Sequence, residues 1–136
     1  MKNKLTMIAA SAVASLVASG VDAATMLKCT FQIEQTDGGW LRSPVYVQRE
    51  GKAKSILVVD SNIKDINGDW LDGRVSIENS VRTTYVWDLR AGDPDGTDYT
   101  VKYQLTVQKS NKSARITAEF LGFENFYDAE GACKSG

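Results

Sequence analysis

The sequence predicts an all-β fold: a small antiparallel up-and-down barrel with one disulfide, with a compact β-sandwich as the alternative. Three observations lead to this prediction. Several short segments after residue 24 alternate apolar and polar residues, no segment there shows a convincing helical period, and the connections between the segments are short. We favour the barrel because closure removes the exposed strand edges that a long meander would leave.

The chain begins with the pattern of a secretory signal peptide. Two lysines precede an uncharged, largely apolar stretch from residue 5 to residue 21, and small residues follow it. We expect cleavage after Ala23, with Ala24 as the alternative position. A membrane anchor is disfavoured because serines and a glycine dilute the stretch. Residues 1–23 are therefore the expected signal peptide, residues 24–136 a single antiparallel β domain without membrane insertion, and the expected location is periplasmic or secreted in a bacterium.

The two cysteines, Cys29 and Cys133, lie near the two ends of the expected mature domain. Export would place them in an oxidising compartment, so we expect a disulfide that ties the first strand to the C-terminal tail. A redox-active or metal-binding pair is the alternative, but the close spacing typical of such pairs is missing.

Seven strands are expected from the alternation, over residues 28–34, 44–48, 55–60, 74–78, 82–90, 99–108 and 113–120. The last three form an antiparallel meander with one polar and one apolar face. The run 55–60 is continuously apolar, so we expect it to be buried on both faces or covered by a loop. Residues 60–73 are rich in Asp, Asn and Gly and are expected to form a loop or a bent ribbon. A helical turn is expected around residues 124–127.

The composition excludes several functions. The chain has 136 residues, 16 Lys and Arg against 17 Asp and Glu, and a pI near 5.4, so it lacks the positive field that nucleic-acid binding needs. It has no histidine, which excludes a Ser-His-Asp or Cys-His nucleophile and a His-ligated zinc. We expect no cofactor and no metal.

Two turns with a shared pattern supply the candidate binding residues. Each contains glycine and delivers a Trp followed by a Leu, namely Trp40-Leu41 and Trp70-Leu71. Two indoles at one rim of a barrel would stack on a sugar ring or anchor a partner loop. The alternative is that both rings plug the barrel and serve only its stability.

Carboxylates are the remaining candidates for catalysis. A glycosidase needs two of them facing one cleft, and Asp37, Asp69 and Asp72 lie close in sequence to the paired Trp residues. Two oxygen-rich clusters, over residues 60–69 and 93–98, resemble calcium loops in composition but do not have EF-hand spacing. Turn formation accounts for all of these residues without catalysis or calcium.

The whole expected mature chain resembles small exported proteins of marine alphaproteobacteria that carry no assigned activity; the segments that carry the resemblance are KCTFQIE, GGWL, RTTYVWDLR, ITAEFLG and EGACKSG. This resemblance implies a bacterial periplasmic location and transfers no functional residues. In plan alone the chain also looks like the small C-type lysozyme inhibitors, antiparallel barrels with Cys near both ends, although their signature loop is missing.

The leading hypothesis is a non-catalytic periplasmic or secreted β-barrel that binds an unknown protein or small-molecule ligand, with inhibition as one form of that binding. The first alternative is a carboxylate-dependent hydrolase of a sugar or cell-wall substrate. The second alternative is a structural protein of the envelope.

Overall fold

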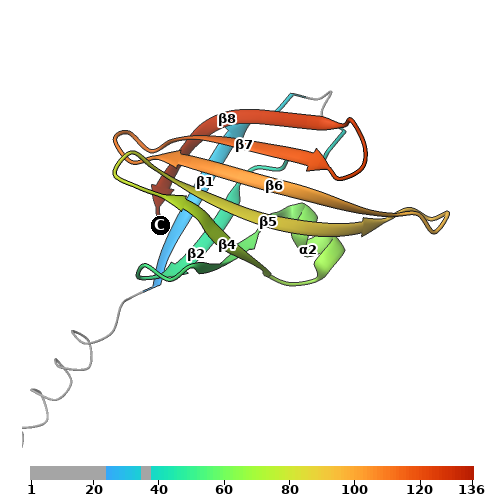
Figure 1. The fold of residues 1–136 in the computed structure, drawn as a ribbon, viewed down its shortest axis with the longest axis horizontal. Coiled ribbons are helices and arrows are strands. Elements are labelled where there is room, and N and C mark those ends of the chain that lie inside the picture. The colour runs from blue at the N-terminus through green and yellow to red at the C-terminus, as the bar shows by residue number, and fades with distance from the viewer. Residues whose placement is uncertain (1–23, 35–37) are drawn as a thin grey trace, which may run out of the picture.

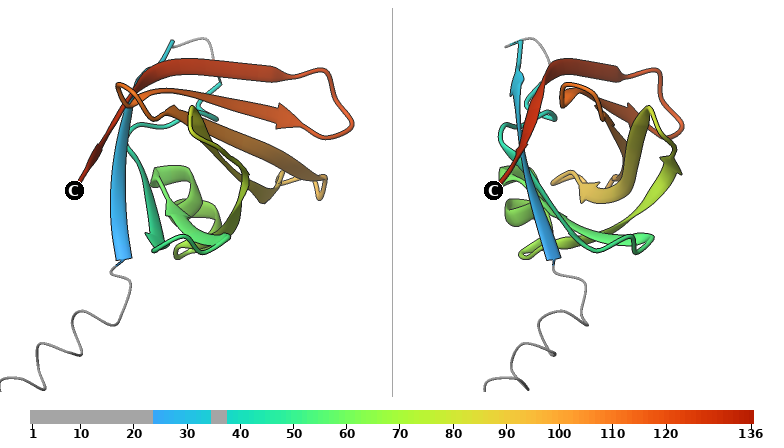
Figure 2. Two further views of the ribbon diagram at one scale, coloured as in Figure 1. Left: turned by 60° about the vertical axis from the view of Figure 1, so that its left-hand side comes forward. Right: turned by 90° about the vertical axis from the view of Figure 1, so that its left-hand side faces the viewer.

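A computed structural model describes residues 24–34 and 38–136, which form one closed antiparallel barrel (Figure 1). Its strands pair in chain order, and the ring they form is seen end-on in the right panel of Figure 2. The expected signal peptide lies outside the described residues, as does Asp37. The elements are β1 (Ala24–Gln32), β2 (Val45–Glu50), β3 (Ser55–Val59), α2 (Ser61–Asn67), β4 (Leu71–Glu78), β5 (Arg82–Gly92), β6 (Asp98–Gln108), β7 (Ser113–Phe120) and β8 (Phe126–Ser135).

The meander expected in the middle of the chain is confirmed. β5 pairs with β6 along its whole length, and β6 pairs with β7, both antiparallel. Tyr85, Trp87 and Leu89 of β5 point into the barrel, where the ring of Trp87 stacks on that of Tyr103 with centroids 5.6 Å apart. On the outer face of β5, the side chains of Thr84 and Val86 are more buried than expected, since they are only 1% and 6% exposed. The hydroxyl of Thr84 is paired there with that of Thr106 at 2.9 Å.

The barrel closes between β1 and β8, and the disulfide lies on this seam. Cys29 and Cys133 are directly opposed in the register, with their Cα atoms 4.0 Å apart, and the expected bond between them is present. Two residues before Cys133, Gly131 faces Phe31. A Cβ atom on Gly131 would lie 1.8 Å from the carbonyl oxygen of Thr30, so only glycine permits this approach of the two backbones.

The helix α2 corrects the expectation of a loop or bent ribbon between residues 60 and 73. Its first turn is capped by Asp60, whose carboxylate accepts the N–H of Ile63 at 2.8 Å, and it ends at Gly68 with a φ of +87°. The side chain of Ile63 is 1% exposed and joins the core, and the helix contacts β3 and β5. Within the described residues, no helix has the length and apolar composition needed to cross a membrane.

Two further expectations are wrong. β3 alternates: Ile56 and Val58 are buried while Leu57 is 38% exposed, so this strand is buried on one face only. The helical turn expected around residues 124–127 is absent, because β8 begins at Phe126 and pairs with β7 on one side and β1 on the other. This strand is the eighth, and it completes the barrel.

The connections alternate between the two ends of the barrel. At one end lie residues 33–34 and 38–44 and the segments 60–70, 93–97 and 121–125, and at the other the three turns 51–54, 79–81 and 109–112. We call the first the acidic end and the second the lysine end, because the described parts of the first carry seven carboxylates and two basic residues, and the second carries four lysines and no carboxylate. In Figure 1 the β5–β6 hairpin projects on the right, at the acidic end, and the C-terminus lies at the opposite side.

Candidate binding surface

Trp40 lies at the acidic end of the barrel, in the connection between β1 and β2. Its backbone carbonyl accepts the hydroxyl of Tyr103 at 2.7 Å, and its ring meets the ring of Phe120 edge-on at 4.9 Å. The side chain is half-buried and packs on the core. Trp40 therefore stabilises this end of the barrel and also contributes to its surface.

The other predicted binding residues divide between surface and core. Trp70 lies at the same end as Trp40, is half-buried, and donates its backbone N–H to the carboxylate of Asp69 at 2.8 Å. Leu71 is half-buried at the start of β4 and packs on the core. Leu41 is 2% exposed, so it is a core residue and offers no surface to a ligand.

A run of touching aromatic rings leads from the barrel interior to the surface beside Trp40. The ring of Phe120, which is 7% exposed, contacts those of Trp40, Tyr99 and Tyr127 at centroid distances of 4.9, 5.9 and 6.2 Å. Tyr99 in turn contacts Phe123 at 5.9 Å. These edge-to-face contacts are the arrangement that aromatic pairs favour, so the cluster is well packed.

Three large apolar side chains on and beside the β7–β8 turn are exposed, and of these Phe123 contacts the cluster through Tyr99. Leu121, Phe123 and Phe126 are 46%, 52% and 54% exposed. The backbone fixes the turn: the N–H of Leu121 donates to Thr100 at 3.0 Å and that of Phe123 to Phe120 at 3.2 Å. We call the surface formed by Trp40, Tyr99, Leu121, Phe123, Phe126 and Tyr127 the aromatic rim. Clustered exposed apolar side chains rimmed by polar residues mark interaction sites in soluble proteins.

The end of the barrel that carries the aromatic rim is negatively charged. Its described connections carry six exposed carboxylates, Glu34, Asp65, Asp69, Asp93, Asp95 and Glu124, and the buried Asp60, against the bases Arg42 and Lys64. Asp93 accepts a hydrogen bond from the hydroxyl of Tyr99, and this bond raises the pKa of Tyr99 to about 12. A carboxylate thus lies directly beside the ring of Tyr99 at the edge of the aromatic rim.

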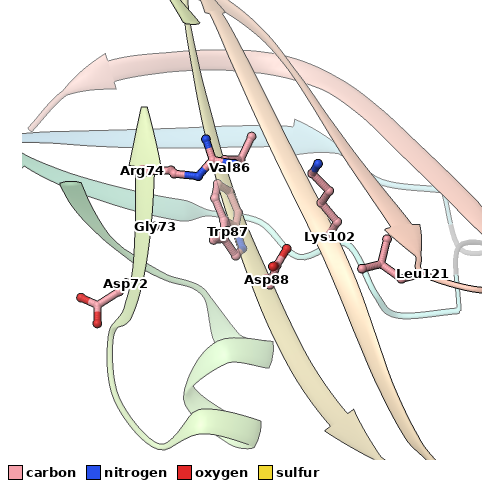
Figure 3. A pocket seen from close by; sticks show the side chains of 8 residues that line it. All are labelled: Asp72, Gly73, Arg74, Val86, Trp87, Asp88, Lys102 and Leu121. Atoms are coloured by element: carbon pink, nitrogen blue, oxygen red, sulfur yellow. The ribbon is translucent and has the colours of Figure 1, made fainter. Parts of the chain in front are cut away.

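The carboxylates considered for catalysis do not form an active site in the described residues. Asp69 is exposed and serves as a turn acceptor, while Asp72 lies on the outer face of β4. Asp72 lines an open depression of about 450 Å³ together with Arg74, Asp88 and Lys102. Figure 3 shows these side chains, which come from β4, β5 and β6. Exposed carboxylates beside basic groups lack the apolar surroundings that a general acid with a raised pKa requires.

Asp60 is a carboxyl group whose pKa is raised, and burial is the main cause. Its oxygen is already used in capping α2. The neighbouring Asn62 is also committed, since it accepts from Arg42 at 3.0 Å and donates to Gly39 at 2.7 Å. Across residues 24–34 and 38–136, no group of three or more acidic or cysteine side chains is placed to hold a metal ion.

Comparison of the chain with protein-family models, with curated proteins and with solved structures finds no match.

Sequence reasoning missed the exposed residues of the aromatic rim. Phe126 falls in the helical turn that was expected around residues 124–127, and Leu121 and Phe123 lie just before it, after the last strand that the alternation predicts. The signal that identifies them is Gly122, with a φ of +87°, between two large apolar residues. A glycine turn flanked by apolar side chains predicts a tight connection that leaves those side chains outside the core.

Proposed function

We propose that this protein is a non-catalytic, exported β-barrel that binds a protein partner through the aromatic rim. The observation that carries the proposal is the exposure of Phe123 and Phe126 beside a packed aromatic cluster at one end of the barrel. Aromatic side chains of this kind supply most of the binding energy in protein interfaces.

A protein is favoured over a small molecule because of the shape of the surface. Phe123 and Phe126 stand on and beside a short turn, each with about half of its surface exposed. A small ligand resting on a projecting turn would leave most of this area in water, whereas small-molecule sites are concave. A partner surface with a shallow apolar depression would cover both rings together.

The charge around the rim favours a basic partner. The surrounding carboxylates would steer a positively charged surface toward the rings and would repel an acidic one. The similarity in plan to lysozyme inhibitors makes inhibition of a basic enzyme one form that such binding would take. Binding residues are also commonly carried on exposed loops that a rigid scaffold holds in position, as the barrel holds the rim.

Export is part of the proposal. The pattern of residues 1–23 supports secretion, and a disulfide is typical of compartments outside the cytoplasm. We place the mature chain in the periplasm or the extracellular medium, where envelope proteins and secreted enzymes are the accessible partners.

The test is affinity capture from an envelope fraction with three baits, each purified after export. The first is the wild type and the second is F123S/F126S. The third, L57S/V81S, replaces two apolar residues that are 38% and 56% exposed away from the rim. We expect the wild type and L57S/V81S to retain the same identified basic protein, and F123S/F126S to bind it at least about tenfold more weakly.

Two outcomes would overturn the proposal. One is equal retention of the partner by the rim variant, and the other is the absence of any protein retained by the wild type and lost from the rim variant. The hydrolase alternative is tested separately with cell-wall glycan and the variants D69N and D72N. Turnover by the wild type that either substitution abolishes would favour that alternative.

A further inference from the structure

The mouth of the barrel at the lysine end contains a second recess, independent of the aromatic rim. It has a volume of about 350 Å³ and is lined by residues from β1, β2, β4, β5, β6 and β8 and from two of the turns. Leu27, Tyr85 and Val107 supply its apolar lining; Tyr85 and Val107 are buried and Leu27 is half-buried. The mouth of a β-barrel is a common position for a small-molecule site.

An ion pair between the buried Arg49 and the partly exposed Glu78 forms the polar wall of this recess. Arg49, whose side chain is 8% exposed, donates two hydrogen bonds to Glu78 at 2.8 and 3.0 Å. Its Nε also donates to the carbonyl of Ala53 at 2.8 Å. Such a bidentate pair fixes the geometry of the wall, because the planar guanidinium is held on both edges.

The recess carries an excess of positive charge. Its lining includes the bases Arg49, Lys109 and Lys112 and a single carboxylate, Glu78, which gives a net charge of +2. Arg49 lowers the pKa of Glu78 to about 2, so this count holds at neutral pH. Lys109 lies 3.6 Å from Glu78 and is partly exposed, and Lys112 is exposed on the same turn. Both ammonium groups are able to turn toward a ligand in the mouth.

We propose that this mouth binds a small amphiphilic anion, a carboxylate or phosphate joined to a short apolar chain. The anionic group would be held by Lys109 and Lys112, and the chain would lie against Leu27 and Val107. A cation of the same shape is disfavoured by the net positive charge, and an anion without an apolar part would not use the apolar wall. The volume is at the small end of ligand sites, so the chain is short.

The test is calorimetric titration of the exported, purified protein at low ionic strength. Octanoate and octyl phosphate are the probes, and acetate, inorganic phosphate and octylammonium are the controls. We expect saturable binding of at least one probe, and at least about tenfold weaker binding of all three controls. Binding should weaken as salt is added, since screening reduces the attraction of the partly exposed lysines.

Matched variants locate the site. K109Q/K112Q removes two lysines from the recess, and K52Q/K54Q removes two from another turn at the same end that do not line it. We expect K109Q/K112Q to weaken the binding of the probe about tenfold, and K52Q/K54Q to change it less than about threefold. Thermal unfolding of each variant confirms that the barrel is intact.

Three results would overturn the proposal: no saturable binding of either octyl anion, equal binding of octylammonium, or equal effects of the two lysine pairs. If the protein bound vesicles of anionic phospholipid but did not bind the soluble probes saturably, the positive charge of the recess would be assigned to binding a membrane surface instead. These results do not bear on the aromatic rim, because the rim lies at the opposite end of the barrel and is tested separately with F123S/F126S.

Discussion

Replacing Cys29 and Cys133 together with alanine removes the covalent link across the seam between β1 and β8. The two residues are opposed in the register and are 0% and 6% exposed, so alanine fits the same positions without introducing a buried polar group. The backbone pairing of the two strands remains, and we expect the variant to keep the barrel fold with a lower free energy of unfolding.

The expected loss follows from the length of the loop that the disulfide closes. The cysteines are 104 residues apart, and in the chain-entropy model a loop of this length stabilises the folded state by about 4–5 kcal/mol. Small domains unfold with a total of about 5–15 kcal/mol, so the variant would retain a small part of the original stability. Loss of the buried sulfur atoms adds to this effect.

Urea unfolding followed by tryptophan fluorescence measures the difference, with the wild type, the double variant and the reduced wild type compared at one pH. With a urea dependence of about 2 kcal/mol per molar, the unfolding midpoint should fall by about 2 M. The reduced wild type should resemble the variant. A loss below about 1.5 kcal/mol would refute the view that this disulfide limits the freedom of the unfolded chain.

Three other substitutions test separate parts of the fold. Gly131→Ala should destabilise the protein by more than about 2 kcal/mol in chemical denaturation, because its Cβ would overlap the backbone of Thr30; an unchanged midpoint would contradict the close approach. Asp60→Ala should cost about 1–2 kcal/mol through loss of the helix cap, whereas Asp60→Asn keeps the cap, removes a buried charge and should be neutral or stabilising. Glu78→Gln should cost about 1–2 kcal/mol at pH 7, a value reduced by solvent screening of the partly exposed carboxylate. The pKa of Glu78 falls from 4.5 to about 2 on folding, so its contribution is present above pH 4.5 and is lost as the pH falls toward 2; the variant should show a shallower acid transition in this window.

The parts of the fold that the sequence predicts are those set by local alternation. The strands β5, β6 and β7 have side chains that change face at every residue, and their expected ranges agree with the structure to within two residues at each end. Barrel closure and the disulfide were predicted together, since a long meander needs a protected edge and the two cysteines lie at its two ends.

The elements that escaped prediction lack such a pattern. The helix α2 has seven residues with two isoleucines, too few for a helical period, although Asp60 before it and Gly68 after it are the usual capping residues. β8 contains Gly131 and small alanines, and it is a strand because β1 and β7 pair with it on both sides. Its structure is set by tertiary contacts, which local pattern does not report.

The candidate surface was predicted in part. The sequence left open whether Trp40 and Trp70 lie at one rim or plug the barrel; both are half-buried at the same end, and only Trp40 belongs to the aromatic rim. The exposed Phe123 contacts Tyr99 because β7 pairs with β6, so the turn that follows β7 lies beside the start of β6. This contact depends on the register between the two strands, which no local motif encodes.

The most direct test of the binding proposal is amide hydrogen exchange of the protein alone and in complex with its captured basic partner. We predict slower exchange in the complex over residues 93–99 and 120–127, with no change in the turns 51–54 and 109–112 at the lysine end. Protection confined to the lysine end or to the outer faces of the strands, with residues 120–127 unchanged, would contradict binding through the aromatic rim.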